Sequence, residues 1–226
     1  IARETKCGVY LNAGREVAVA STKAFTAQVV VLVLISIWFA QNKKINETIR
    51  KELIMGLRNL NSDISNTIEI NKDKSKEVAL YLKNKNSLFI LGKGTCESIA
   101  KEGSLKIKEI GYIHAEAYSS SALKHGPFAL IEPGLPIIML VPDDELYVKN
   151  TSSMEEVKSR EAYVIGISDK ELKKDIVSIQ MTIPNNKHFR SFLSVIPLQM
   201  IAYELALLGG HNPDMPKNLA KVCSTM

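Results

Sequence analysis

Cysteine is scarce in this sequence. Only 3 of the 226 residues are cysteines, and Cys7, Cys96 and Cys223 are far apart and odd in number. They form no Cys-x-x-Cys pair and have no histidine at metal-ligand spacing, which argues against both a disulfide framework and a zinc site. Because few and unpaired cysteines are typical of a reducing compartment, we expect a cytoplasmic protein.

Concentrated positive charge and long apolar runs are also missing. The net charge of +5 comes from lysines scattered among acids, without a basic run interleaved with aromatic residues, so we expect no nucleic-acid partner. The longest apolar run, residues 29–40, is interrupted by Ser36 and is shorter than the ~20 residues that a membrane span needs. It predicts a buried core helix and no membrane insertion. The chain begins at Ile1 without an initiator Met or a signal-peptide pattern, so we expect a piece of a longer protein.

The remaining pattern alternates between strands and helices, and 46% hydrophobic content is enough for a sizeable core. Four short apolar stretches are predicted strands: residues 87–92, 136–142, 162–168 and 178–184. Three further stretches are predicted helices: residues 96–110, 143–158 and 191–208. This order predicts an α/β sandwich, doubly wound around a parallel sheet. Residues 43–75 have helical periodicity, and residues 71–76 resemble a surface linker.

The stretch KEGSLKIKEI, residues 101–110, has an unusual arrangement of charge for a helix. Glu102, Lys106 and Glu109 fall at i, i+4 and i+7, along the edge of an apolar face that contains Ile107 and Ile110. The ordinary interpretation is a surface helix with a Glu–Lys pair. The alternative is a general-base carboxylate beside an ammonium, where desolvation raises the carboxylate pKa and the ammonium opposes the rise.

Three other motifs are candidates for function. The loop GKGTCE, residues 92–97, ends a predicted strand. It lacks a complete phosphate-binding pattern, so it is weak evidence for a phosphate site, and the alternative is a tight turn that lets the sheet meet the helix. SSSALKHGP places His125 before a Gly-Pro break, where it is either structural or a general acid. Residues 212–226 predict an extended tail, which is either disordered or docked through Leu219 and Ala220, carrying Lys221 into a pocket.

Taken together, three motifs resemble one family. NAG.E..VASTKAFT.Q (residues 12–28), EGSLKIKEIGYIHAEAY with LKHGP (residues 102–127) and NLAK (residues 218–221) are similar to the isomerase half of glutamine–fructose-6-phosphate aminotransferases. The resemblance implies two sugar-isomerase (SIS) domains, each a parallel α/β sandwich. Residues 1–70 would be the last, helical part of the first, and residues 71–226 the second with a catalytic tail.

The same resemblance implies a reaction and its residues. Fructose 6-phosphate and ammonia from glutamine would give glucosamine 6-phosphate, without a metal or other cofactor. Glu109 would shuttle the proton between C1 and C2, beside Lys106. His125 would open the sugar ring in the site of the neighbouring subunit of a homodimer, and Lys221 would act at C2. The expected sugar contacts are Glu102, Val19, Ser21 and Ala220.

The family's phosphate-binding loop and its glutaminase domain both lie upstream of the region that this chain matches. We therefore expect the 226-residue chain alone to bind fructose 6-phosphate weakly. Two alternatives remain: a sugar-phosphate deaminase or isomerase with two SIS domains and no glutaminase, and a sugar-phosphate sensor without turnover. The combination of Glu109, His125 and Lys221 favours an enzyme, because a sensor needs no proton shuttle.

Overall fold

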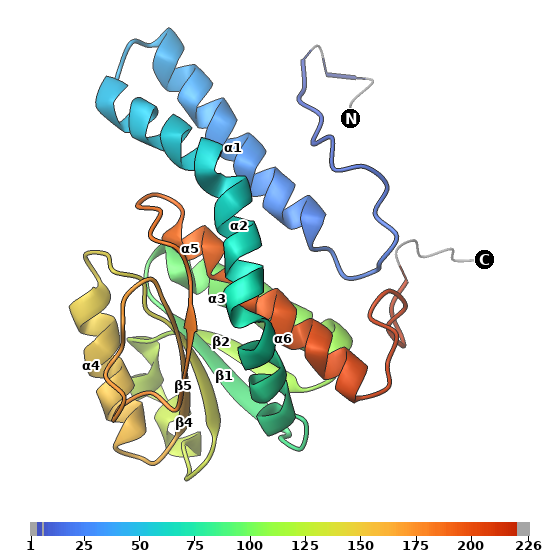
Figure 1. Cartoon of the computed structure of the whole chain (residues 1–226), viewed down its shortest axis with the longest axis vertical. Coiled ribbons are helices and arrows are strands. Elements are labelled where there is room, and N and C mark those ends of the chain that lie inside the picture. The colour runs from blue at the N-terminus through green and yellow to red at the C-terminus, as the bar shows by residue number, and fades with distance from the viewer. Residues whose placement is uncertain (1–3, 6, 221–226) are drawn as a thin grey trace.

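The centre of the molecule is a five-stranded parallel sheet (Figure 1). The computed structural model describes residues 4–5 and 7–220. The strands, in the spatial order β2-β1-β3-β4-β5, are β2 (His114–Ser119), β1 (Ser87–Gly92), β3 (Pro136–Leu140), β4 (Tyr163–Ser168) and β5 (Ile179–Thr182). All four pairings are parallel. The predicted parallel α/β architecture is confirmed.

Helices cover both faces of the sheet, as the doubly wound prediction requires. Leu88 and Ile90 of β1 belong to one buried cluster, together with residues of α2 (Glu47–Leu82), α3 (Thr95–Lys106) and α6 (Val195–Leu208). The alternate β1 residues, Phe89 and Leu91, belong to a second cluster with Met154 and Val157 of α4 (Tyr147–Lys158). Successive side chains of a strand point to opposite faces, so β1 contributes to both halves of the core. The remaining short elements are α5 (Arg190–Leu193), the π-helix η1 (Ile107–Gly111) and the 3-10 segments Ala122–His125 and Pro127–Leu130.

One strand was missing from the sequence prediction. β2 has the sequence HAEAYS, and of its six residues only Ala115 is fully buried. It lies at the edge of the sheet and pairs with β1 alone. An edge strand of this kind carries polar residues, so it lacks the continuous apolar run that marked the other four strands.

The prediction of a buried core helix at residues 29–40 is wrong in part. The helix is present as α1 (Lys23–Asn42), but Ile37 is its one fully buried residue, while Leu32 is 62% and Trp38 60% exposed. α1 packs along α2 on the side away from the sheet (Figure 1). By length and composition, α1 and the stretch Arg190–Leu208 could each cross a membrane, but core helices meet the same criteria and the second stretch is mostly buried. A helix that is apolar all round needs cover on every side. α2 packs along one side of α1, while another side, with Leu34 and Trp38, borders an open apolar pocket shared with residues 7–9.

The predicted linker at residues 71–76 is also wrong, because α2 continues without a break from Glu47 to Leu82. Asn71 and Ser75 are buried against the sheet, whereas their lysine and aspartate neighbours lie on the outer side of the helix. The charged residues that suggested a linker are therefore the solvent-facing side of an amphipathic helix. α2 crosses the expected domain boundary at residues 70–71 as a continuous helix.

Candidate active site

The candidate site is built on α3 and the π-helix that follows it. The sheet leads into α3 through Gly94, which adopts a positive φ of 58°. Ile107 and Ile110 of the predicted apolar face are buried, which confirms that face, and Ile99 and Gly103 are buried beside them. Gly103 allows α3 to lie close to α6, because a Cβ atom there would lie 3.0 Å from the Cβ and Cγ atoms of Leu198.

The predicted helix at residues 96–110 changes from α-helical to π-helical geometry within the charged stripe, between Lys106 and Glu109. α3 ends at Lys106, and η1, with π geometry, continues from Ile107 to Gly111. π-helical turns inside α-helices are rare and occur frequently at functional sites. The wider turn contains Glu109, the residue that the family resemblance implies to be the base.

Lys106 is the centre of the site, and its side chain is only 3% exposed. Its Nζ lies 2.7 Å from Glu109 Oε2 and 3.5 Å from Glu102 Oε1. The carboxylate side chains are 21% and 14% exposed, respectively, so they form the wall between the buried ammonium and solvent. The structure therefore joins the three predicted residues in one ion-pair cluster and excludes the surface-helix interpretation.

Glu102, the second carboxylate of the cluster, lies in a partly desolvated environment. Burial raises the pKa of Glu102 above its ordinary value, the Lys106 ammonium opposes this rise, and the Glu109 carboxylate adds to it. The site thus has two carboxylates for one cation, in a partly desolvated place. A proton brought to this site has two neighbouring acceptors, which suits a group that must accept a proton and return it.

The loop that contains Val19 and Ser21 is tied to the tail at the other end of the chain. The backbone N–H of Val19 donates to the carbonyl oxygen of Asp214 at 3.1 Å. Ser21 Oγ donates to Glu16 Oε1 at 3.2 Å, and Ala20 between them is buried. Val19 and Ser21, the two predicted sugar contacts, therefore lie on a loop that is hydrogen-bonded to the C-terminal tail.

The tail follows α6 and has neither helix nor strand from residue 211 to residue 220, as the sequence predicts. Ala220 is exposed. Lys221, the predicted tail lysine, lies outside the described residues, so its role stays a prediction. Figure 1 shows the tail returning toward the loop that precedes α1.

His125 stands apart from the charged cluster. It ends a 3-10 turn, Ala122–His125, and is exposed. Within the described part of the chain, no hydrogen bond or ion pair connects it to Lys106 or its two carboxylates. Its neighbour Lys124 pairs with Glu156 at 2.6 Å.

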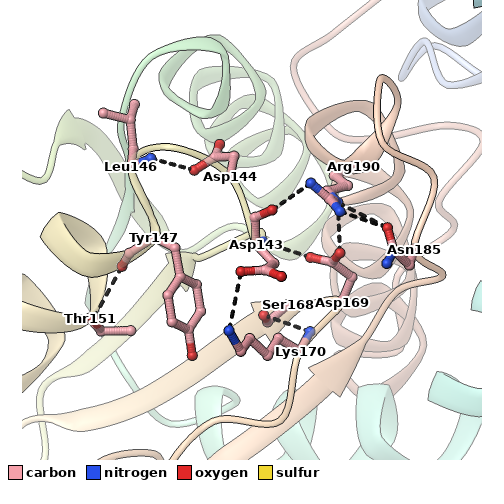
Figure 2. Close-up of polar contacts among 10 residues, drawn as sticks. All are labelled: Asp143, Asp144, Leu146, Tyr147, Thr151, Ser168, Asp169, Lys170, Asn185 and Arg190. Atoms are coloured by element: carbon pink, nitrogen blue, oxygen red, sulfur yellow. Dashed lines mark hydrogen bonds and ion pairs between the residues drawn. The ribbon is translucent and has the colours of Figure 1, made fainter. Parts of the chain in front are cut away.

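A second polar network, which the sequence prediction missed, lies at the carboxyl ends of β3 and β4 (Figure 2). Asp169, whose side chain is 1% exposed, pairs with Arg190 Nε at 2.7 Å and accepts the backbone N–H of Asp143 at 2.7 Å. Arg190 also donates to Asn185 Oδ1 and to the carbonyl oxygen of Asp143. These bonds fasten the loops after β3 and β4 to α5, which is a structural role. The sequence did contain a signal for this network, because Asp143 and Asp169 each directly follow a predicted strand.

Comparison with known proteins places this geometry in a family. The SIS domain model matches residues 81–209. The chain is 42% identical over 222 residues to a probable glutamine–fructose-6-phosphate aminotransferase (isomerizing) of Acanthamoeba polyphaga mimivirus, and 41% identical over 227 residues to the enzyme of Chlorobaculum tepidum. Each match covers 98% of this chain and 36% of the relative, so the chain spans about a third of the length of these curated relatives.

A solved structure agrees with the sequence comparison. The C-terminal domain of glucosamine-fructose-6-phosphate aminotransferase from Francisella tularensis superposes with a TM-score of 0.89 at 33% identity. The match covers 95% of this chain and 62% of that one. The fold has a parallel five-stranded sheet with helices on both faces, and the family model matches the part of the chain that contains this sheet. The chain therefore belongs to the SIS-domain family.

Proposed function

We propose that this chain is the isomerase part of a glutamine–fructose-6-phosphate aminotransferase, acting in the cytoplasm. Its substrates would be fructose 6-phosphate and ammonia, and its product glucosamine 6-phosphate. The names of the relatives and of the Francisella tularensis structure support this proposal, as does their match along nearly the whole chain. The reaction needs a base that moves a carbon-bound proton, and the charged cluster supplies a candidate.

The observation that carries the proposal is the buried ammonium of Lys106 between two carboxylates at a π-helical turn. After ammonia condenses with the C2 carbonyl of the open-chain ketose and water leaves, a proton must pass from C1 to C2. Glu109 accepts the C1 proton, which converts the imine into an enaminol intermediate, and returns the proton to C2, leaving an aldehyde at C1 and an amine at C2. The Lys106 ammonium donates a hydrogen bond to this carboxylate at 2.7 Å and holds it in place during the transfer.

The remaining residues would serve the same reaction. We assign ring opening to His125 of a neighbouring subunit in a homodimer, which agrees with its exposure and its separation from the cluster. Lys221 would act at C2, and Glu102, Val19, Ser21 and Ala220 would contact the sugar. The tie between Val19 and the tail supports a shared pocket.

We also propose that residues 1–70 complete a preceding SIS domain and that residues 71–226 form a second one. The uncovered apolar sides of α1 support this division, because the rest of a preceding domain would cover them. A glutaminase domain further upstream would supply the ammonia. The share of the relatives that this chain spans leaves room for both parts.

The test is Glu109→Gln in the complete protein that carries this chain, with Glu97→Gln as the matched control. Glu97 lies on α3, the helix that leads into the turn with Glu109, and also pairs with a lysine, Lys101 at 2.9 Å, but this pair is exposed. We expect Glu109→Gln to lower glucosamine 6-phosphate formation by about 10²–10⁴-fold, since a general acid–base group contributes this much. Fructose 6-phosphate binding should stay within about tenfold, because the loss is confined to the transition state. Unchanged turnover would refute the assignment.

A further inference from the structure

Tyr112 occupies an unusual position between the charged cluster and the tail. It is the first residue after η1, so it follows Glu109 by one short stretch of backbone. Its φ of 56° lies in the left-handed region, which is uncommon for a bulky side chain and costs conformational energy. This conformation ends the π-helix and turns the aromatic ring away from the helix axis toward the tail.

Three contacts hold the tail to this ring. The Tyr112 hydroxyl accepts the backbone N–H of Lys217 at 2.8 Å. The Lys217 ammonium lies 4.4 Å from the ring centroid, within the range of a cation–π contact. His211 meets the ring edge to face, with centroids 4.6 Å apart. One side chain thus contacts the tail at both ends of a seven-residue stretch that has no helix or strand of its own.

Residues 211–217 of the tail are also held by the loop that precedes α1. The carbonyl oxygen of Asp214 accepts the N–H of Val19, and Pro216 is buried. Ala220 is three residues beyond Lys217, and three residues span at most about 11 Å. The position of Lys217 therefore limits where Ala220 can lie.

We propose that Tyr112 is a positioning residue that sets the register of the tail against the helix carrying Glu109. This inference rests on the proposed function, since it assumes that the tail carries groups used in the reaction. Because Tyr112 is joined rigidly to η1 and contacts the tail directly, a change in the π-turn and a change in the tail are transmitted to each other. The base and the tail would then be aligned as one unit.

The experiment compares Tyr112→Phe and Tyr112→Leu with Tyr81→Phe in the complete protein. Tyr112→Phe keeps the ring and removes one hydrogen-bond acceptor, whereas Tyr112→Leu removes all three contacts. Tyr81 is the matched control, because its hydroxyl also makes one 2.8 Å hydrogen bond to the backbone, at Gly134, away from the tail. Trypsin cleavage after Lys217 in the absence of substrate reports opening of the tail, and kcat and KM report its effect on the reaction.

We expect cleavage after Lys217 to be about threefold to tenfold faster in Tyr112→Phe, the equivalent of one net hydrogen bond. In Tyr112→Leu we expect an increase on the order of 30–100-fold. The kcat of Tyr112→Leu should fall at least about tenfold with KM within about twofold, because misplaced groups slow the chemical step. Tyr81→Phe should resemble the unchanged protein in both measurements.

Each negative result has a separate meaning. If cleavage is no faster in either Tyr112 variant, Tyr112 does not hold the tail in place, and the proposal is refuted whatever the activity of the variants. Faster cleavage with unchanged kcat overturns the positioning role and leaves the proposed function standing. An unchanged protein that forms no glucosamine 6-phosphate overturns the proposed function and, with it, the positioning role, while the cleavage rates still decide whether Tyr112 anchors the tail.

Discussion

Asn71 offers the sharpest test of how α2 is joined to the sheet. Its side chain is fully buried on α2 and faces the outer edge of β5. Nδ2 donates to the carbonyl oxygen of Thr182 at 2.7 Å, and Oδ1 accepts the Thr182 N–H at 3.0 Å. Nδ2 also donates to the carbonyl oxygen of Thr67 at 2.8 Å. The amide therefore bonds to the edge strand as the peptide group of a neighbouring strand would.

The substitution Asn71→Ala leaves both backbone groups of Thr182 without this partner. Each polar group left unsatisfied costs about 1–3 kcal/mol, and partial access of water lowers the sum. We expect a loss of about 2–4 kcal/mol in the free energy of unfolding, and a fall in melting temperature of about 5–15 °C for a chain of this size. Asn66→Ala is the matched control, because Asn66 is exposed on the same helix and the gain in helix propensity cancels.

Urea and thermal unfolding of the two alanine variants measure the difference directly. Asn71→Asp is a useful companion: it keeps the acceptor for the Thr182 N–H but places a carboxylate against the carbonyl oxygen. We expect it to be at least as destabilising as Asn71→Ala. A difference of less than about 1 kcal/mol between Asn71→Ala and Asn66→Ala would show that water replaces the amide, and would refute the reasoning.

Two further predictions concern α3. Gly103→Ala should destabilise the protein by about 1–2 kcal/mol in urea unfolding, because overpacking against Leu198 outweighs the roughly 1 kcal/mol gain in helix propensity, and a net gain would contradict the close crossing. Cys96 is buried and burial raises its pKa to about 11, so iodoacetamide should label the exposed Cys7 and leave Cys96 unmodified up to about pH 9. Peptide mass mapping checks this, and labelling of Cys96 in the folded protein would show that α3 opens at its first turn.

The sequence predicted what depends on local periodicity and missed what depends on distant partners. Buried strands such as β3 and β4 were found because each is continuously apolar, and the Glu102–Lys106–Glu109 stripe was found because helix geometry fixes which residues meet. The edge strand β2 was missed because its sequence, HAEAYS, includes polar residues and has no continuous apolar run.

The solvent exposure of a helix and the geometry of a helical turn likewise depend on tertiary contacts. The apolar composition of α1 predicts a core helix, but its solvent exposure depends on which other segments pack against it. No local pattern announces the π-helical turn at Ile107–Gly111, since the sequence continues with helical spacing. The contact between Tyr112 and the tail joins residues 105 positions apart, which periodicity cannot relate.

The order in which the chain is synthesised gives α6 a further consequence. α6 packs against α2, α3 and η1, yet it follows every strand in the sequence. At about 5–20 residues per second, roughly 6–25 s pass between synthesis of the end of α2 and the end of α6. During this time the sides of α2 and α3 that α6 covers have no partner helix, so we expect chaperones to bind the nascent chain there. A chain stalled between Gly111 and α6 carries Lys106 and Glu109 without the helix that packs behind them, so the site is assembled only after α6 has been synthesised.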